Sequence, residues 1–276
     1  MKATIIGLDG KKGNSIELPK QFSEKVDKGL IKRAVQAIQS ASVQNSFPTP
    51  HAGRFNTAVY VGMRHKPQQH RTINIGHARK PRLKNRRSLI SGQVASIPAT
   101  VGGPKAHPPK ADKEWEEKIN KKEKQKATNS AIAATAFIEL AKARGHVFDH
   151  KLGFPLVVEG KLENLVKTKD VKKAFEAIGV WSDVEKAAEK KMNRAGKGKK
   201  RGRIYKKRKS VLIVASSTEK VYKAARNLEG VDIISVKDLN ADVLAPGAEA
   251  GRLTLWSEKA LVEMGSEKKG KVIVKA

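Results

Sequence analysis

The feature that most constrains this chain is a long stretch without a carboxylate. Between Asp27 and Asp112 the sequence holds no Asp or Glu. Within residues 45–111 it also holds twelve Lys and Arg, five of the seven histidines and eight of the eleven prolines. Prolines remove backbone donors and block regular ladders, and the segment shows no sustained period of 2 or 3.6 residues. We therefore expect residues 45–111 to stay outside the hydrophobic core.

Residues 45–111 form one basic island. A second basic island lies at residues 190–209, which read KKMNRAGKGKKRGRIYKKRK. It holds twelve basic residues and no acid. The chain of 276 residues has 57 Lys and Arg against 27 Asp and Glu, a net charge of +30, and the two islands supply 24 of those charges. The other residues carry only +6 and have the composition of an ordinary globular domain. A surplus concentrated in this way predicts a polyanionic partner, most often a nucleic acid.

Outside the islands, apolar strands alternate with amphipathic helices. Continuous apolar strands between such helices are typical of a parallel sheet covered on both faces. We therefore predict an α/β fold, a doubly wound domain with a mainly parallel sheet, formed by residues 1–44 and 112–276. A long extended basic arm, residues 45–111, leaves this domain after the first helix, and residues 190–209 form a basic loop within it. The expected strands are 3–6, 154–158, 211–215, 231–236 and 252–256, and the expected helices are 28–43, 113–144, 162–166, 171–178, 219–228, 257–264 and, as a short helix or turn, 237–244.

The composition excludes several classes of protein. There is no cysteine, so a disulfide scaffold, a thiol nucleophile and a thiolate metal site are excluded. No apolar run approaches the ~20 residues of a membrane helix, and Lys2–Asp9 is too short an apolar stretch for a secretory signal. We expect a cytoplasmic protein that has no cofactor or metal ion and that binds neither a membrane nor a small-molecule substrate.

Nucleotide-binding and catalytic motifs are weak or missing. No G-x-G-x-x-G follows a strand, and the glycines of 7–13 are explained as a turn. The helix start after the 211–215 strand could hold a phosphate, but the Ser and Thr residues there are explained as a cap. Residues 146–150 (HVFDH) include ligand-type side chains, for which a loop role is favoured over metal binding or catalysis. We therefore predict that the chain is not an enzyme.

Each basic island has two interpretations. Residues 45–111 are either a disordered basic linker or an arm that becomes ordered only against nucleic acid. Apolar residues such as Phe55, Tyr60 and Ile73 are too numerous for a solvated tail and favour the arm. Residues 190–209 are either a run of charge that is solvated or resembles a nuclear-localisation signal, or a loop whose glycines let the backbone approach phosphate closely.

The residue types of both islands suit RNA. Lys and Arg neutralise phosphates, Arg also stacks on bases, and neighbouring aromatic rings can stack on unpaired bases. The predicted RNA contacts of the arm are Arg54, Arg64, Lys66, Arg71, Arg79, Lys80, Arg82, Lys84, Arg86, Arg87, Lys105, His107 and Lys110. Those of the basic loop are Arg194, Lys197, Lys199, Lys200, Arg201, Arg203, Tyr205, Lys206, Lys207 and Arg208.

Nine short segments, in order along the chain, carry a resemblance to one known family. They are Gly103–Lys110, Ile119–Lys124, Ser130–Ala136, Arg144–His146, Lys167–Lys169, Arg194–Lys199, Arg226–Val231, Leu244–Gly247 and Gly251–Trp256. Each segment is a weak signal alone, but their joint order is specific. Through these segments the chain resembles the universal large-subunit ribosomal protein four family, in its archaeal and eukaryotic form.

The resemblance implies a structural constituent of the large ribosomal subunit that binds large-subunit rRNA, contacts neighbouring ribosomal proteins and supports assembly. It implies an α/β body on the ribosome surface and an arm whose far end lies near the narrow part of the peptide exit tunnel. Where the family commonly has Gly-x-Gly-Arg, residues 59–65 hold a single glycine, and we expect Arg64 to Arg79 to form the tip. Two alternatives from other classes remain, an RNA-modifying enzyme on a doubly wound domain and a non-ribosomal nucleic-acid-binding protein.

Overall fold

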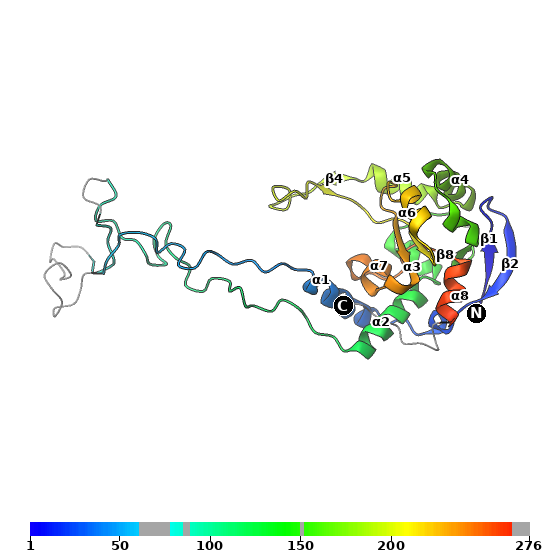
Figure 1. The fold of residues 1–276 in the computed structure, drawn as a ribbon, viewed down its shortest axis with the longest axis horizontal. Coiled ribbons are helices and arrows are strands. Elements are labelled where there is room, and N and C mark those ends of the chain that lie inside the picture. Colours follow the sequence, from blue (N-terminus) through cyan, green and yellow to red (C-terminus); the bar gives the residue numbers. More distant parts are fainter. Residues whose placement is uncertain (61–77, 85–88, 150–151, 267–276) are drawn as a thin grey trace. The chain divides into compact units, whose positions relative to one another are not determined.

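The chain divides into two compact units. The computed structural model describes residues 1–60, 78–84, 89–149 and 152–266 (Figure 1). The first unit consists of Met1–Ser42 and Glu116–Ala276, and the second is Val43–Trp115. Every helix and strand named below, all from the described residues, lies in the first unit.

The first unit alternates strands and helices along much of its length. Its strands are β1 Lys2–Ile6, β2 Lys12–Glu17, β3 Leu156–Val158, β4 Met192–Asn193, β5 Tyr205–Lys206, β6 Leu212–Ala215, β7 Asp232–Ser235 and β8 Thr254–Ser257. Its α-helices are α1 Lys28–Ala41, α2 Lys121–Ala134, α3 Ile138–Arg144, α4 Thr168–Ile178, α5 Trp181–Glu189, α6 Glu219–Ala225, α7 Ala241–Leu244 and α8 Glu258–Ser266. Its 3₁₀ turns are η1 Lys20–Ser23, η3 Gly160–Asn164, η4 Val236–Asp238 and η5 Pro246–Ala248.

Six of the strands form one central sheet in the order β2-β1-β3-β8-β6-β7. Within this sheet the pairs β1–β3, β3–β8, β8–β6 and β6–β7 are parallel, and only the edge pair β1–β2 is antiparallel. The predicted mixed α/β fold with a mainly parallel sheet is therefore confirmed. Strand β2 was absent from the prediction because its six residues, KGNSIE, form a mostly exposed edge strand without an apolar pattern.

Successive residues of each central strand face two different cores. In β6, Leu212 and Val214 belong to one cluster and Ile213 belongs to the other. The first cluster also takes side chains from α1, α2, α7 and α8, and the second takes them from α3, α4, α5 and α6. The fully buried strands read as continuous apolar runs because both of their faces are covered.

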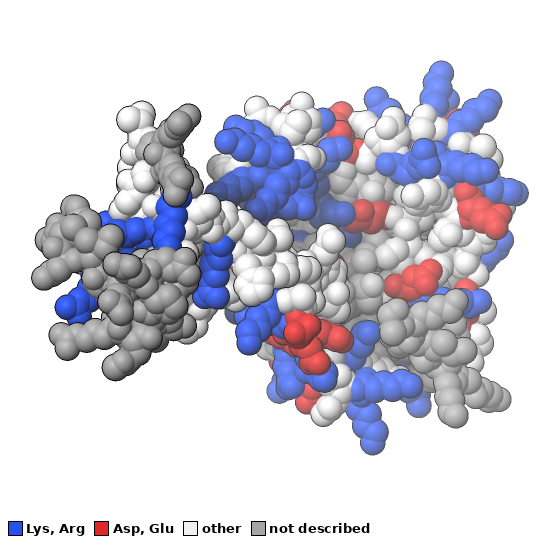
Figure 2. All heavy atoms as spheres, turned by 60° about the vertical axis from the view of Figure 1, so that its left-hand side comes forward, with Lys and Arg blue, Asp and Glu red and all other residues white. Residues whose placement is uncertain are grey.

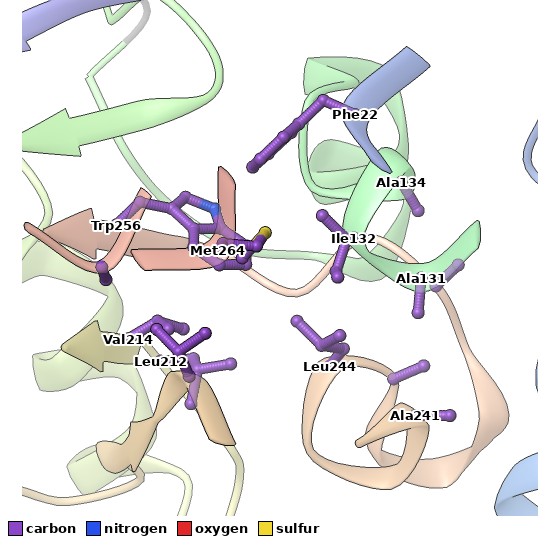
Figure 3. Close-up of a cluster of buried hydrophobic side chains, with 14 of the residues drawn as sticks. Phe22, Ala131, Ile132, Ala134, Leu212, Val214, Ala241, Leu244, Trp256 and Met264 are labelled. Atoms are coloured by element: carbon purple, nitrogen blue, oxygen red, sulfur yellow. The ribbon is translucent and has the colours of Figure 1, made fainter. Parts of the chain in front are cut away.

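The centre of the first core is an aromatic pair. Phe22 of η1 and Trp256 of β8 are almost completely buried, and their rings meet edge to face with centroids 5.2 Å apart. Figure 3 shows both rings beside Ile132 of α2 and Met264 of α8. Aromatic pairs with this geometry add to the stabilisation from buried area. The contact fixes the N-terminal segment against the middle of the sheet.

The helix predicted over 113–144 is two helices. Helix α2 begins at Lys121 after Asn120, and it ends at Ala134. Thr135 follows, and its hydroxyl donates to the carbonyl of Ile132 at 2.7 Å, which competes with the regular helical pattern. Helix α3 then ends at Gly145, as expected, where φ is +89°. The apolar period continues through the break, so periodicity alone did not reveal it.

The second unit is held together by hydrogen bonds between loops. Val59 and Arg82 exchange both backbone hydrogen bonds, at 3.1 and 3.2 Å, and Arg82 also forms a bridge with Val94. Nearer the ends of the unit, the Asn45 side chain donates to the carbonyl of Ala111 at 2.8 Å. Chain segments far apart in the sequence are therefore tied together within this unit. That the unit acts as an extended arm stays a prediction.

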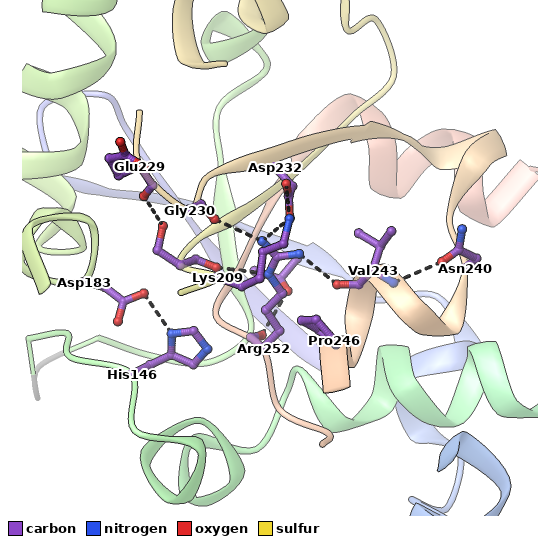
Figure 4. A network of polar contacts seen from close by, with 12 residues as sticks. His146, Asp183, Lys209, Glu229, Gly230, Asp232, Asn240, Val243, Pro246 and Arg252 are labelled. Carbon is purple, nitrogen blue, oxygen red and sulfur yellow. Dashed lines mark hydrogen bonds and ion pairs between the residues drawn. The ribbon is translucent and has the colours of Figure 1, made fainter. Parts of the chain in front are cut away.

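A buried arginine joins three elements of the body. Arg252, whose side chain is fully buried, donates through Nε to the carbonyl of Ser210 at 3.0 Å and through Nη1 to that of Val243 at 2.9 Å (Figure 4). Its Nη2 lies 2.6 Å from a carboxylate oxygen of Asp232. Burial alone would raise the pKa of Asp232, but the charge of Arg252 and hydrogen bonds from Lys209 and Arg252 lower it below 3.8.

Replacing Asp232 with Asn should leave the Arg252 charge buried without its counter-charge. We expect the free energy of unfolding to fall by about 2–3 kcal/mol at neutral pH, measured by urea denaturation. Because folding lowers the pKa of Asp232, its contribution is present above its ordinary pKa and is lost as the pH falls through the lowered value. The difference between the two proteins should therefore shrink in acid.

The matched control is Lys209→Met, which removes the other ion pair to the same carboxylate. Lys209 lies 2.8 Å from Asp232, but half of its side chain is exposed, so we expect a loss below about 1 kcal/mol. Equal losses from the two variants would contradict the role given to Arg252.

Candidate nucleic-acid interface

The second basic island forms a short hairpin. Strands β4 and β5 pair antiparallel, with Asn193 opposite Tyr205, and the amide of Arg194 donates to the carbonyl of Ile204 at 2.7 Å. Gly196 and Gly202 have φ of +79° and +80°, a conformation that favours glycine. The backbone geometry of the turn therefore explains these two glycines, for which the sequence suggested close approach to phosphate.

Ion pairs fix the base of this hairpin to the body. Glu229, which follows α6, lies 3.8 Å from Nζ of Lys191 and 3.1 Å from Nζ of Lys207. Lys191 also stands 4.7 Å above the ring of Tyr205, and Lys209 pairs with Asp232. The two legs of the hairpin are thus held against the segment that leads into β7.

The remainder of the hairpin presents its charge to solvent. Every predicted contact residue of the basic loop is exposed. Figure 2 shows Lys and Arg side chains gathered over much of one face, with Asp and Glu in smaller separate groups. Exposed cations gathered on one hairpin suit phosphate binding, because each can neutralise a phosphate and release its counterions.

A groove of about 790 Å³ opens between the hairpin base and the body. We call it the hairpin-base groove. Its walls include Lys206 and Arg208 from the hairpin, Lys186 from α5 and Arg144 at the end of α3. Arg144 donates to the carbonyls of Pro246 and Glu249. Burial and then the charge of Arg252 lower the pKa of Arg144 to about 10, so it is still a cation at neutral pH.

His146 in this groove is paired with an acid that the sequence did not suggest. Its Nδ1 lies 2.8 Å from a carboxylate oxygen of Asp183, and the other oxygen of Asp183 accepts from the amide of Val147 at 3.0 Å (Figure 4). The expected loop role of His146 therefore includes a buried contact with α5. Asp149 instead donates its amide to the carbonyl of Gly179, and His150 lies outside the described residues. A partner 37 positions away leaves no short-range signal in the sequence.

The helix start after β6 already has an acidic partner from the chain. The amides of Ser216 and Ser217 donate to the two carboxylate oxygens of Glu163, at 2.9 and 3.3 Å. Glu163 lies in η3 and is 5% exposed. The carboxylate thus occupies the position where phosphate often binds in doubly wound domains. The sequence alone had left open whether a phosphate binds at this helix start.

The predicted contact residues of the second unit have different surroundings. Arg82 donates through its guanidinium to the carbonyls of Gly92 and Ala78, at 2.8 and 3.0 Å, so it holds its own chain together. Phe55 and Tyr60 are largely exposed. The exposed members of the predicted set are Arg54, Arg79, Lys80, Lys84, Lys105, His107 and Lys110. Arg64, Lys66, Arg71, Arg86 and Arg87 lie outside the described residues.

The described residues also bear on two other classes of site, metal centres and membrane spans. Within residues 1–60, 78–84, 89–149 and 152–266, no group of three or more His, Asp or Glu side chains is arranged to hold a metal ion. In the same part of the chain, no helix is long and apolar enough to cross a bilayer.

Replacing Arg82 with Ala should loosen the second unit. The amides of Leu83 and Gly92 donate to neighbouring carbonyls beside the Arg82 guanidinium, and we expect both to exchange faster with solvent deuterium in the variant. Lys80→Ala, at an exposed neighbouring position, should leave their exchange unchanged. If both amides of the RNA-free parent chain exchange at the rate of an unstructured peptide, the described hydrogen bonds do not persist in solution and the disordered form expected from the sequence is correct.

Comparisons with known proteins agree with the resemblance carried by the nine segments. A sequence model of the "Ribosomal protein L4/L1 family" matches residues 16–267. The protein named "Large ribosomal subunit protein uL4" of Archaeoglobus fulgidus is 47% identical over 266 residues, which cover 96% of this chain and 98% of that protein. Proteins of the same name from Methanoregula boonei and Halobacterium salinarum are 44% and 43% identical, each over 96% of this chain and 99% of their own length. The chain is a member of the ribosomal protein L4/L1 family.

Proposed function

We propose that this protein is a structural constituent of the large ribosomal subunit that binds large-subunit rRNA and supports subunit assembly. The observation that carries the proposal is the 47% identity, over nearly the full length of both chains, to a protein named for that subunit. The protein works within the cytoplasmic ribosome, beside neighbouring ribosomal proteins. It is not an enzyme and uses no cofactor or small-molecule substrate.

The surface charge of the hairpin supports RNA as the partner. Its exposed Lys and Arg residues neutralise phosphates, and exposed Tyr205 offers a ring on which an unpaired base can stack. RNA strands that approach one another closely repel through their phosphates. A cationic element between them removes this repulsion, which is how a protein without catalytic groups promotes assembly.

The second unit supplies the other proposed RNA contact. The absence of acids from residues 28–111 means that no carboxylate on this segment repels phosphate. Exposed Phe55 and Tyr60 stand among its cations, as expected of a surface that meets unpaired bases. Its far end, from Arg64 to Arg79, is proposed to lie near the peptide exit tunnel, and all but its last two residues fall outside the described part of the chain.

An RNA-modifying enzyme is the less favoured alternative. Such an enzyme on a doubly wound domain would bind a nucleotide-containing cofactor at the carboxyl ends of the parallel strands. At the end of β6, the amides of Ser216 and Ser217 donate to Glu163 instead. The position best suited to such a cofactor is therefore occupied by a side chain of the protein itself, which disfavours this alternative.

The hairpin-tip variant, with Lys197, Lys199, Lys200 and Arg201 all replaced by Gln, tests the RNA proposal. We expect weaker binding to transcribed large-subunit rRNA and a salt dependence whose logarithmic slope is smaller by up to about 3, because four phosphate contacts are lost. Binding is measured by filter retention across a salt series, with transfer RNA and duplex DNA as competitors. Deletion of residues 45–111 should lower both the affinity and the slope further.

The matched control replaces four exposed lysines of α4 and α6, Lys169, Lys173, Lys220 and Lys223, with Gln. This variant has the same net charge as the hairpin-tip variant. If the two variants lose the same affinity, the hairpin has no special role and only the total charge matters. If duplex DNA competes as well as rRNA for the unaltered chain, the ribosomal proposal is wrong.

A further inference from the structure

The hairpin-base groove combines two kinds of surface. Eight cationic side chains and two acidic ones line it, and one of the acids, Asp183, contacts His146. The cations come from both the body, with Lys28 of α1 and Lys186 of α5, and the hairpin, with Lys206 and Arg208. A concave surface whose charged lining is mostly cationic focuses its field and concentrates anions inside it.

The same groove also has apolar lining. Leu140 and Ala143 of α3, Ala187 of α5, Met192 of β4 and Pro246 of η5 all contribute to it. A site for inorganic anions alone would not need these contacts. A groove that combines apolar and cationic side chains matches a nucleotide, which has a flat base and charged phosphates.

One polar atom on the wall lacks a partner. Nε2 of His146 makes no hydrogen bond among the described residues, and the side chain of His146 is only 4% exposed. A buried polar atom without a partner costs free energy that a hydrogen bond from a ligand would recover. The Asp183 contact on Nδ1 fixes the orientation of the ring, and His146 is one of the residues that line the groove.

We propose that the hairpin-base groove binds one unpaired RNA nucleotide, with its base on the apolar lining and its flanking phosphates on the cations of the two walls. The inference rests on the proposed function and adds a site on the body to the contacts of the arm and the hairpin tip. RNA fits better than an acidic peptide because one wall of the groove is the base of the hairpin, so a strand bound to the exposed cations continues into the groove. A volume of about 790 Å³ is within the range of small-ligand sites.

The first test removes the two body cations and leaves the hairpin unaltered. The Lys28→Gln/Lys186→Gln variant should bind large-subunit rRNA severalfold more weakly, with a salt slope smaller by about 1.4 for two phosphate contacts on a single strand. The control is Lys169→Gln/Lys173→Gln, which removes two exposed lysines of α4 outside the groove and should bind like the parent chain. Lys186 also donates to the carbonyl of Gly145, so thermal melting of each variant checks that the fold is kept.

The second test locates the base in the unaltered protein. The full chain is bound to large-subunit rRNA that contains 4-thiouridine, irradiated and digested, and the crosslinked peptides are identified by mass spectrometry. We expect crosslinks in 138–146 or 186–192, the segments that hold Leu140 and Met192.

The two tests separate this inference from the proposed function. If the groove variant binds like its control and crosslinks occur only in 194–203 and 45–111, the groove proposal is wrong while rRNA binding stands. If neither the parent chain nor any variant prefers rRNA to duplex DNA, the proposed function itself fails.

Discussion

The ion pair between Arg252 and Asp232 is the interaction on which the remaining features depend. A fully buried guanidinium is costly, and here one carboxylate and three backbone carbonyls compensate for it. Those partners belong to the segments that lead into β6 and β7 and to α7, so one side chain fixes the relative position of all three. Asp232 also accepts from Lys209 at the foot of the hairpin. The basic hairpin is thereby attached to the segment that Arg252 holds in place.

The proposed binding surfaces lie away from the position where most doubly wound domains bind their ligands. In such domains the ligand commonly lies at the carboxyl ends of the parallel strands. Here the carboxylate of Glu163 accepts hydrogen bonds from the amides that follow β6. The cationic surfaces lie instead on the hairpin and in the groove at its base. The sheet supplies stability and position, while segments outside its regular elements carry the charge. This division of roles suits a protein whose proposed partner is large and rigid.

Sequence reasoning predicted the central sheet because strands such as β6 are buried on both faces, which makes them continuous apolar runs. It missed β2, whose polar residues lie on an edge, and the break at Thr135, where one hydroxyl interrupts an unbroken apolar period. The basic hairpin was visible as composition, but the pairing of β4 with β5 was not. The His146–Asp183 contact and the groove arise from tertiary folding, and no local sequence pattern predicts either of them.

Because Glu229 pairs with lysines on both legs of the hairpin, the net positive charge is lower at the base of the hairpin than at its tip. Lys191, Lys207 and Lys209 near the base pair with that carboxylate or with Asp232, whereas the cations from Arg194 to Arg203 face solvent. The proposed RNA partner would therefore meet the exposed cations of the tip first, and the partly neutralised base only afterwards. Under the proposed RNA binding, capture at the tip and seating at the base would be separate kinetic events. The tip would govern the association rate, which falls steeply with ionic strength, and the base would govern how long the complex lasts.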